Sequence, residues 1–247
     1  MRTRLALLSL PGAVLFAWPF LGLGPPPAVP ALAVTVGAAG ALLLMELGAR
    51  QLDNRRLALL AALAALDSAV RLAFITGIAG FNPVFFLILC AGFAFGPSFG
   101  FLVGAFSLLT SALVGGGMGP WVPFQVFAAG WVGAAAGLCG PGRPLPTRWD
   151  VARLAAVGFV TGFAFGALMD VPGWAAGFQG SPELGWRPGM PPLTALAHFG
   201  RYYLATSLAY DSFRAVGSAL MVVALGRPVL AALNRLRARF TFEVIAA

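Results

Sequence analysis

Residues 57–74 read LALLAALAALDSAVRLAF, a nearly continuous apolar run that is interrupted only by Asp67, Ser68 and Arg71. Its length and its alanine and leucine content predict a helix rather than a strand. The run approaches the ~20 apolar residues that an α-helix needs to cross the hydrocarbon core of a bilayer. The stretch therefore favours a membrane protein, and it places an acid and a base where water is scarce.

The composition of the whole chain points the same way. Hydrophobic residues make up 60% of its 247 residues, and charged residues make up only 10%. A soluble domain of this size needs more charge to cover its surface, so we interpret the chain as an all-α integral membrane protein. The net charge of +8 comes from arginines that mostly flank apolar runs. For that reason we expect the lipid bilayer, and no nucleic acid, as the partner of these charges.

Hydropathy and helix-breaking residues predict eight membrane spans. These spans lie at residues 5–23, 30–48, 57–79, 83–95, 98–115, 121–139, 152–171 and 202–225. The fourth and fifth are short and are separated only by Gly96 and Pro97, which predicts a tight helical hairpin. The first run resembles a signal peptide. We favour an uncleaved span, because cleavage near AVPALA would shorten the second run.

The arginines orient these spans. With the N-terminus inside, the arginines of the cytoplasmic segments are Arg2, Arg4, Arg50, Arg55, Arg56, Arg143, Arg148, Arg153, Arg227, Arg235, Arg237 and Arg239. Arg187 lies outside, and Arg201 lies at a boundary. The positive-inside rule then predicts a multi-pass protein of the cell membrane with both termini in the cytoplasm. We divide the chain into residues 1–56, two helices and a basic linker, and residues 57–247, a six-helix core with a basic tail.

Three outer connections join these spans: GFNP at residues 80–83, GGGMGPW at residues 115–121, and the long segment 172–200. The long segment is rich in glycine, proline and aromatic residues and lacks a long apolar run, so we expect a loop. It is either a lid over an outward-facing cavity or an interfacial loop whose tryptophans lie among the lipid head groups.

Two acid–base pairs lie inside predicted spans. Asp67 and Arg71 are four residues apart, and Asp211 and Arg214 are three apart, so each pair lies on one helix face. A charge at the bilayer centre costs about 2.5–3.5 kcal/mol. We therefore expect the charges to pair, in a network that bridges the third and eighth spans. The network is either a polar wall of a substrate site, which Asp170 would also face, or a structural bridge.

Several chemistries are missing from the sequence. His198 is the only histidine, so an HExxH zinc site is excluded and we expect no metal site. The chain has no GxxxxGK[ST] motif and no nucleophile–base constellation, so we expect neither an ATP site nor catalytic residues. If the protein drives transport, its energy comes from a partner or from an ion gradient.

Four stretches together resemble one known family. They are LALLAALAALDSAVRLAF (57–74), GPSFGFLVGAFSLLTSALVGGGMGPW (96–121), VPFQVFAAGWVGAAAGL (122–138) and YYLATSLAYDSFRAVGSALMVVALGRPV (202–229). From residue 57 onward the chain resembles the substrate-binding S component of energy-coupling factor (ECF) vitamin transporters. The resemblance implies a six-helix core, which matches spans three to eight, and a small molecule bound near the outer face beneath the three outer connections.

The resemblance also implies partners. In this family, AxxxA motifs on the first core helix contact a transmembrane T component, which docks on two cytoplasmic ATPases. The loaded S component then topples in the membrane and carries its site inward. By position, the T-component contacts are Ala58, Ala61, Ala62 and Ala65. Asp67 and Arg71 lie on the same helix and are therefore expected to face away from the T component.

The ligand implied by the resemblance is a vitamin, with no covalently bound cofactor, and the nearest likeness is to the S components associated with cobalamin. The candidate substrate-binding residues are Asp67, Arg71, Asn82, Trp121, Gln125, Asp170, Trp174, Tyr203, Asp211 and Arg214. The outer-face aromatic residues among them suit a large, partly planar ligand and equally suit the membrane interface.

Two other functions stay open from the residues alone. One is a stand-alone secondary transporter in which Asp67, Asp170 or Asp211 carries protons. The other is a structural membrane protein without a small-molecule ligand. The two spans that precede the six-helix core are assigned no role by the sequence.

Overall fold

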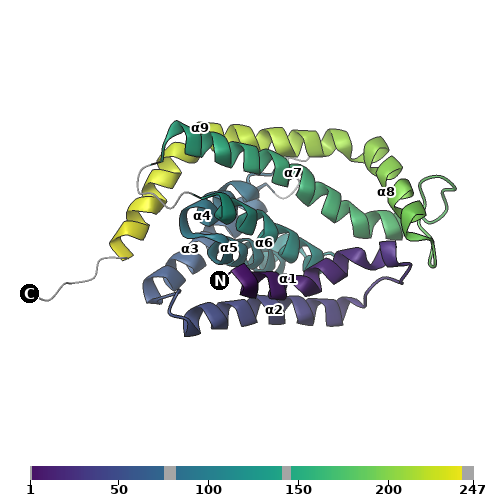
Figure 1. Ribbon diagram of the computed structural model, residues 1–247, viewed down its shortest axis with the longest axis horizontal. Coiled ribbons are helices and arrows are strands. Elements are labelled where there is room, and N and C mark those ends of the chain that lie inside the picture. Colours follow the sequence, from purple (N-terminus) through teal and green to yellow (C-terminus); the bar gives the residue numbers. More distant parts are fainter. Residues whose placement is uncertain (1, 75–81, 141–145, 241–247) are drawn as a thin grey trace, which may run out of the picture.

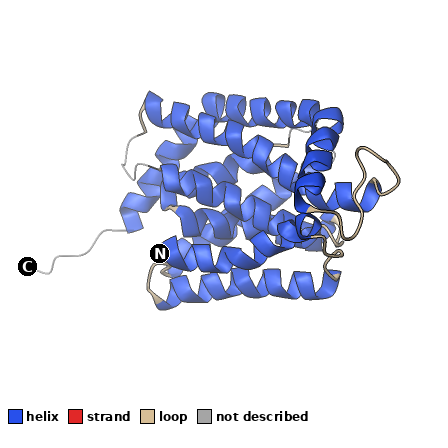
Figure 2. Ribbon diagram, turned by 45° about the vertical axis from the view of Figure 1, so that its right-hand side comes forward, coloured by secondary structure: helices blue, strands red, loops and turns tan. Residues whose placement is uncertain are grey.

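The computed structural model describes residues 2–74, 82–140 and 146–240, which form helices and connecting loops (Figure 2). The helices are α1 (Arg2–Ala17), η1 (Trp18–Leu21), α2 (Ala28–Gly48), α3 (Asn54–Ala73), α4 (Val84–Phe95), α5 (Pro97–Ser111), η2 (Ala112–Gly116), α6 (Val122–Cys139), α7 (Arg148–Gly177), α8 (Pro192–Thr206) and α9 (Leu208–Phe240). The predicted all-α class is confirmed.

Each of the eight predicted spans overlaps a helix, and residues 75–79 at the end of the third span lie outside the described residues. Within the described residues, six helical segments are long and apolar enough to cross a membrane: Thr3–Leu21, Ala28–Gly48, Pro97–Gly116, Val122–Cys139, Arg148–Gly177 and Leu208–Arg239. The other two spans differ for separate reasons. Helix α4 has only 12 residues, which span about 18 Å, and α3 carries Arg55, Arg56, Asp67 and Arg71. The integral-membrane interpretation is confirmed, with α3 and α4 as its two least typical spans.

The outer part of the C-terminal half differs from the prediction. Helix α7 continues through Pro172 to Gly177, and α8 forms inside the segment that was predicted to be a loop. The last span begins after a break at Ser207 rather than at residue 202, and α9 continues through Pro228 to Phe240. Both extensions have one cause: proline is a weaker helix breaker in membrane helices than in soluble ones.

The helices form layers around α4, α5 and α6 (Figure 1). Helices α1 and α2 pack together along one side of this layer, and α7 and α9 pack together along the other. Helix α3 packs on α5 and α4, while α8 crosses the end of the molecule beside α7 and α9. The most deeply buried side chains belong mainly to α4, α5 and α6, including Ile88, Leu102 and Val103.

Glycines let the central helices approach closely. The predicted hairpin is confirmed: α4 ends at Phe95, α5 begins at Pro97, and Gly96 between them has φ +99°, a conformation that favours glycine. A Cβ atom on Gly133 of α6 would overlap the backbone of Gly100 in α5, and the reverse also holds. This glycine contact, α5 against α6 at residues 100 and 133, is the small-residue packing typical of membrane helices.

Arginines of α1, α7 and α9 bind to helix ends at one end of the bundle. Arg4 in α1 donates a hydrogen bond to the carbonyl oxygen of Met45 at the end of α2. Arg153 in α7 donates to the carbonyl oxygen of Cys139 at the end of α6, and Arg237 in α9 donates to that of Ala94 at the end of α4. The first and last described helices therefore begin and end on this side, the left in Figure 1, which we name the basic end.

Candidate functional site

A cavity of about 490 Å³ lies at the end of the molecule opposite the basic end. We name it the outer cavity. Its walls come from the α1–α2 connection, the start of α6, the end of α7, and Trp186. The lining residues are Trp18, Pro25, Pro26, Pro120, Trp121, Phe124, Met169, Pro172, Gly173, Ala175, Ala176, Gln179 and Trp186. The volume falls in the range of pockets that hold small molecules. The apolar and aromatic lining is also typical of such pockets.

The segment 178–191, which we name the capping segment, closes the cavity against the N-terminal helices. The Trp186 indole is buried, and its Nε1–H donates a hydrogen bond to the carbonyl oxygen of Pro19 at 2.9 Å. The backbone N–H of Gly189 donates to the carbonyl oxygen of Gly22 at 3.1 Å. These two bonds join chain segments that are distant in sequence and fix the capping segment over η1.

A buried aromatic cluster supports the cavity from behind. The rings of Trp18 and Trp186 meet edge to face at 5.0 Å between centroids. Trp174 is fully buried behind the wall, where its Nε1–H donates to the carbonyl oxygen of Leu184 at 2.5 Å and its ring packs on Phe199. Trp174 therefore positions the capping segment and α8, and it does not line the outer cavity.

The cavity contains one unsatisfied donor. The Nε1–H of Trp18 is buried and has no hydrogen-bond partner among the described residues. Buried polar groups are nearly always hydrogen-bonded, so an orphaned donor in a cavity wall indicates an acceptor on a ligand or a water. Gln179 adds a second polar group, because its Nε2 donates to the carbonyl oxygen of Ala175 at 3.2 Å and its Oε1 remains to accept.

The first predicted charge pair is not formed. Arg71 donates from Nη1 to Ser111 Oγ at 2.7 Å and from Nη2 to Gln125 Oε1 at 3.2 Å. Asp67 is fully buried, and neither of its carboxylate oxygens has a hydrogen-bond partner in the described part of the chain. Asp67 and Arg71 therefore form no direct ion pair, because the arginine reaches across to the acceptors that α5 and α6 present, although the two residues are close enough for their charges to interact.

The second predicted pair is present. Asp211 and Arg214 of α9 form an ion pair, and the Asp211 carboxylate lies against Gly166 of α7, where a Cβ would overlap it. The Arg214 guanidinium lies over the ring of Tyr210, 5.5 Å from its centroid. Asp170, one turn along α7, is close enough to Asp211 and Arg214 for their charges to act on it.

The two charged groups do not form one network. The first lies on α3, α5 and α6, and the second lies on α7 and α9. No hydrogen bond or ion pair between described residues joins them. The predicted bridge between the third and eighth spans is therefore wrong, because Arg71 bonds to α5 and α6, whereas Asp211 and Arg214 pair within α9.

Of the candidate substrate-binding residues, Trp121 lines the outer cavity and Gln125 lies one turn further along α6. Asn82 joins the end of α3 to the start of α4: its Nδ2 donates to the Phe74 carbonyl oxygen at 2.7 Å, and its Oδ1 accepts from the Val84 N–H at 3.0 Å. Tyr203 is half-buried in α8 against Phe199. The first part of the connection GFNP, residues 80 and 81, lies outside the described residues.

Sequence reasoning missed the contribution of the N-terminal helices to the cavity. Trp18, Pro25 and Pro26 lie in or beside the first two spans and were assigned no role. An interfacial tryptophan followed by prolines was the available signal, but it does not tell which distant segment will pack against it. Trp186 was noted only as part of the long outer connection.

The two faces of α3 differ in burial. Ala58, Ala61, Ala62 and Ala65 are all exposed. Leu60, Leu63, Ala64 and Asp67 are buried on the opposite face against the core. At 3.6 residues per turn, Asp67 lies about half a turn around the helix from Ala58. The exposed alanine face is therefore available to a partner helix, and the charged groups point away from it.

Comparison with known proteins adds one finding. A family model described as ECF transporter, substrate-specific component, matches residues 55–226, more than two thirds of the chain. The matched region runs from the start of α3 into α9, so α1 and α2 lie outside it. No curated protein and no solved structure matches the chain.

Proposed function

Because the chain belongs to the family of ECF transporter substrate-specific components, we propose that it captures a vitamin or a related cofactor precursor in the outer cavity. The chain is itself a multi-pass membrane protein, and it is a transport subunit rather than an enzyme. In this proposal it delivers its ligand together with a T component and two cytoplasmic ATPases, which supply the energy. Both termini, and with them the basic end, face the cytoplasm.

The outer cavity is the observation that carries the proposal. It lies at the end of the bundle opposite the basic end and beneath two of the connections that the family resemblance singles out, residues 115–121 and 172–200. Its indole rings suit the face of a planar ligand. The unpartnered Trp18 Nε1–H suits a carbonyl, carboxylate or ring-nitrogen acceptor on that ligand.

Cobalamin is the first ligand to test, since it is the ligand that the resemblance of the sequence implies. The cavity volume of about 490 Å³ favours a second candidate, a smaller vitamin with one or two aromatic rings. A corrinoid is several times larger than such a ring system and would require the capping segment to move away from η1.

A titration separates these ligands. Purified protein in mild detergent is titrated with cobalamin and with smaller ring-containing vitamins while tryptophan fluorescence is recorded. Saturable quenching by one of them is expected, because three tryptophans line the cavity. The Trp121→Phe variant should lose part of the quenching. Trp149→Phe, which removes an exposed indole at the basic end, is the matched control and should not. Absence of saturation with every vitamin contradicts the proposal.

Docking of the T component is proposed to use the exposed alanine face of α3. Small residues allow close helix approach in lipid, so Ala61→Trp and Ala65→Trp should abolish copurification of the T component and uptake while ligand binding stays intact. The matched control is Val160→Trp, which places the same bulk on an exposed position of α7. Unchanged uptake in the α3 variants, or equal loss in the control, contradicts this docking face.

A further inference from the structure

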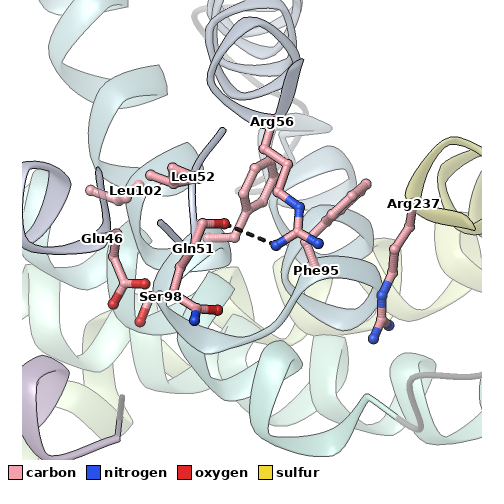
Figure 3. A pocket seen from close by; sticks show the side chains of 9 residues that line it. Glu46, Gln51, Leu52, Arg56, Phe95, Ser98, Leu102 and Arg237 are labelled. Carbon is pink, nitrogen blue, oxygen red and sulfur yellow. Dashed lines mark hydrogen bonds between the residues drawn. The ribbon is translucent and has the colours of Figure 1, made fainter. Parts of the chain in front are cut away.

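A second pocket lies at the basic end, far from the outer cavity. It has a volume of about 280 Å³ and is enclosed by the α2–α3 connection, the α4–α5 turn and the end of α9 (Figure 3). Its polar lining consists of Glu46, Gln51, Arg56, Ser98 and Arg237. Phe95, Phe99 and other apolar side chains form the rest of the wall. We name it the inner pocket.

One side of the inner pocket holds two unsatisfied polar groups. Glu46 of α2 is 2% exposed and Ser98 of α5 is 4% exposed. Neither Glu46 Oε1 nor Ser98 Oγ has a hydrogen-bond partner among the described residues. Figure 3 shows the two side chains near one another on the same side of Gln51. A buried carboxylate oxygen without a partner is costly, so this side of the pocket suits a cationic group that carries N–H donors.

The other side of the pocket is basic. Arg56 donates from Nη1 to the carbonyl oxygen of Gln51 at 2.9 Å, and Arg237 donates from Nη1 to that of Ala94 at 2.9 Å. A guanidinium has five N–H donors, so each arginine keeps several donors for a ligand. Both guanidinium groups lie across Gln51 from Glu46 (Figure 3). Two arginines on the same side of a pocket supply the charge and the N–H donors that a phosphate group needs.

We propose that the inner pocket binds a zwitterionic phosphoethanolamine group, with its ammonium at Glu46 and Ser98 and its phosphate at Arg56 and Arg237. An anion alone would meet the Glu46 carboxylate, and a cation alone would meet two guanidinium groups. A group with both charges satisfies both sides. The phenylalanine rings beside the polar groups suit the start of an acyl chain. The ligand comes either from a phospholipid head group or from free phosphoethanolamine.

Such a ligand would join parts of the chain that share few other contacts here. Glu46 belongs to α2, Ser98 to α5 and Arg237 to α9. A bound phosphoethanolamine group would therefore hold the N-terminal helices, which lie outside the matched family region, against the core at the basic end. This role is independent of the ligand of the outer cavity.

Native mass spectrometry of the delipidated full-length protein tests the proposal. The probes are phosphatidylethanolamine, its monomethyl and dimethyl derivatives, and phosphatidylcholine, all with the same acyl chains. Methylation removes the N–H donors one at a time while the phosphate stays. We expect affinity to fall along this series, by about tenfold or more from the first to the last, as for the loss of a charge-assisted hydrogen bond. Equal binding of all four lipids overturns the proposal, and this series needs no variant.

Variants locate the site. Glu46→Gln should make the four lipids bind with similar affinity. Glu183→Gln, which changes an exposed carboxylate in the capping segment, should leave the fall in affinity along the series unchanged. Arg237→Gln should weaken the binding of all four lipids, whereas Arg239→Gln, at an exposed position of α9, should not. An unchanged series in Glu46→Gln, or equal effects of the variants and their controls, overturns the proposal.

Free phosphoethanolamine separates the two sources. If it competes with phosphatidylethanolamine at comparable concentration, the head group alone is the ligand and a soluble source suffices. If it does not compete while the lipid series holds, the acyl chain contributes and the ligand is a membrane lipid. Both results support the proposed chemistry. Binding of phosphatidylglycerol as tightly as phosphatidylethanolamine would contradict it, because phosphatidylglycerol lacks the ammonium.

Discussion

Two tryptophans of the outer cavity differ in the hydrogen bonding of their indole N–H groups. The Nε1–H of Trp186 donates to Pro19, while that of Trp18 has no partner among the described residues. Trp186→Phe should therefore lower the free energy of unfolding by about 1–2 kcal/mol, because the Pro19 carbonyl loses its donor. Trp18→Phe should leave stability nearly unchanged and weaken ligand binding. Thermal unfolding and ligand titration of both variants make the comparison, and the reverse pattern would contradict this assignment.

The first charged group gives a second prediction at the residue scale. Arg71 makes two side-chain hydrogen bonds, and Asp67 makes none in the described structure. Arg71→Gln should lower the free energy of unfolding by about 1–3 kcal/mol. Asp67→Asn should leave it unchanged or raise it, because a buried, unpaired carboxylate is replaced by a neutral group of the same shape. A larger loss in Asp67→Asn, measured by unfolding in detergent, would show that the carboxylate has a partner after all.

At the scale of elements, the glycine contact between α5 and α6 determines how closely the central helices pack. Gly133→Ala would place a methyl group into the backbone of α5 at Gly100. Overpacking of this kind costs about 1–3 kcal/mol, so a lower melting temperature is expected. Gly37→Ala in α2 is the control, since a Cβ there meets no atom within 4 Å. Equal melting temperatures for the two variants would show that the helices can separate at no cost.

Helix α3 shows how one element serves two purposes. Its exposed alanines leave a face free for a membrane partner, and its opposite face brings Asp67 and Arg71 into the core. The sequence, through its family resemblance, predicted this separation, because a face that docks on the T component leaves the charges of the same helix to point the other way. It did not predict the partners of Arg71, because Ser111 and Gln125 lie 40 and 54 residues away in the chain.

At the scale of the whole molecule, the arginines predict the orientation in the membrane. A cysteine at the exposed position 239 of α9 should react with a membrane-impermeant maleimide only after the membrane is opened, and a cysteine at position 183 should react in intact cells. Both variants, Arg239→Cys and Glu183→Cys, carry Cys139→Ala, while Cys90 is buried and stays. Labelling of position 239 in intact cells would contradict the proposed topology and place this end of α9 outside the cell.

The sequence alone determined the all-α membrane class, the approximate positions of most spans and the resemblance to ECF S components. These properties follow from hydropathy, helix breakers and short motifs, which are local. It misplaced the end of α7, because proline interrupts membrane helices less than soluble ones. It missed α8, because that helix lies in a segment without a long apolar run. Local sequence also does not decide whether a buried charge pairs with a residue of its own helix or with another helix. Arg71, which bonds to α5 and α6, is the example.

Only the tertiary structure decided where a ligand fits. The outer cavity exists because the capping segment packs on η1, and the bond between Trp186 and Pro19 spans 167 residues of sequence. The inner pocket likewise joins α2, α5 and α9. Hydropathy reports whether each residue prefers lipid or water, and it carries no information on which distant residue will be its neighbour. Cavities form between such neighbours, so they are decided by how the helices pack.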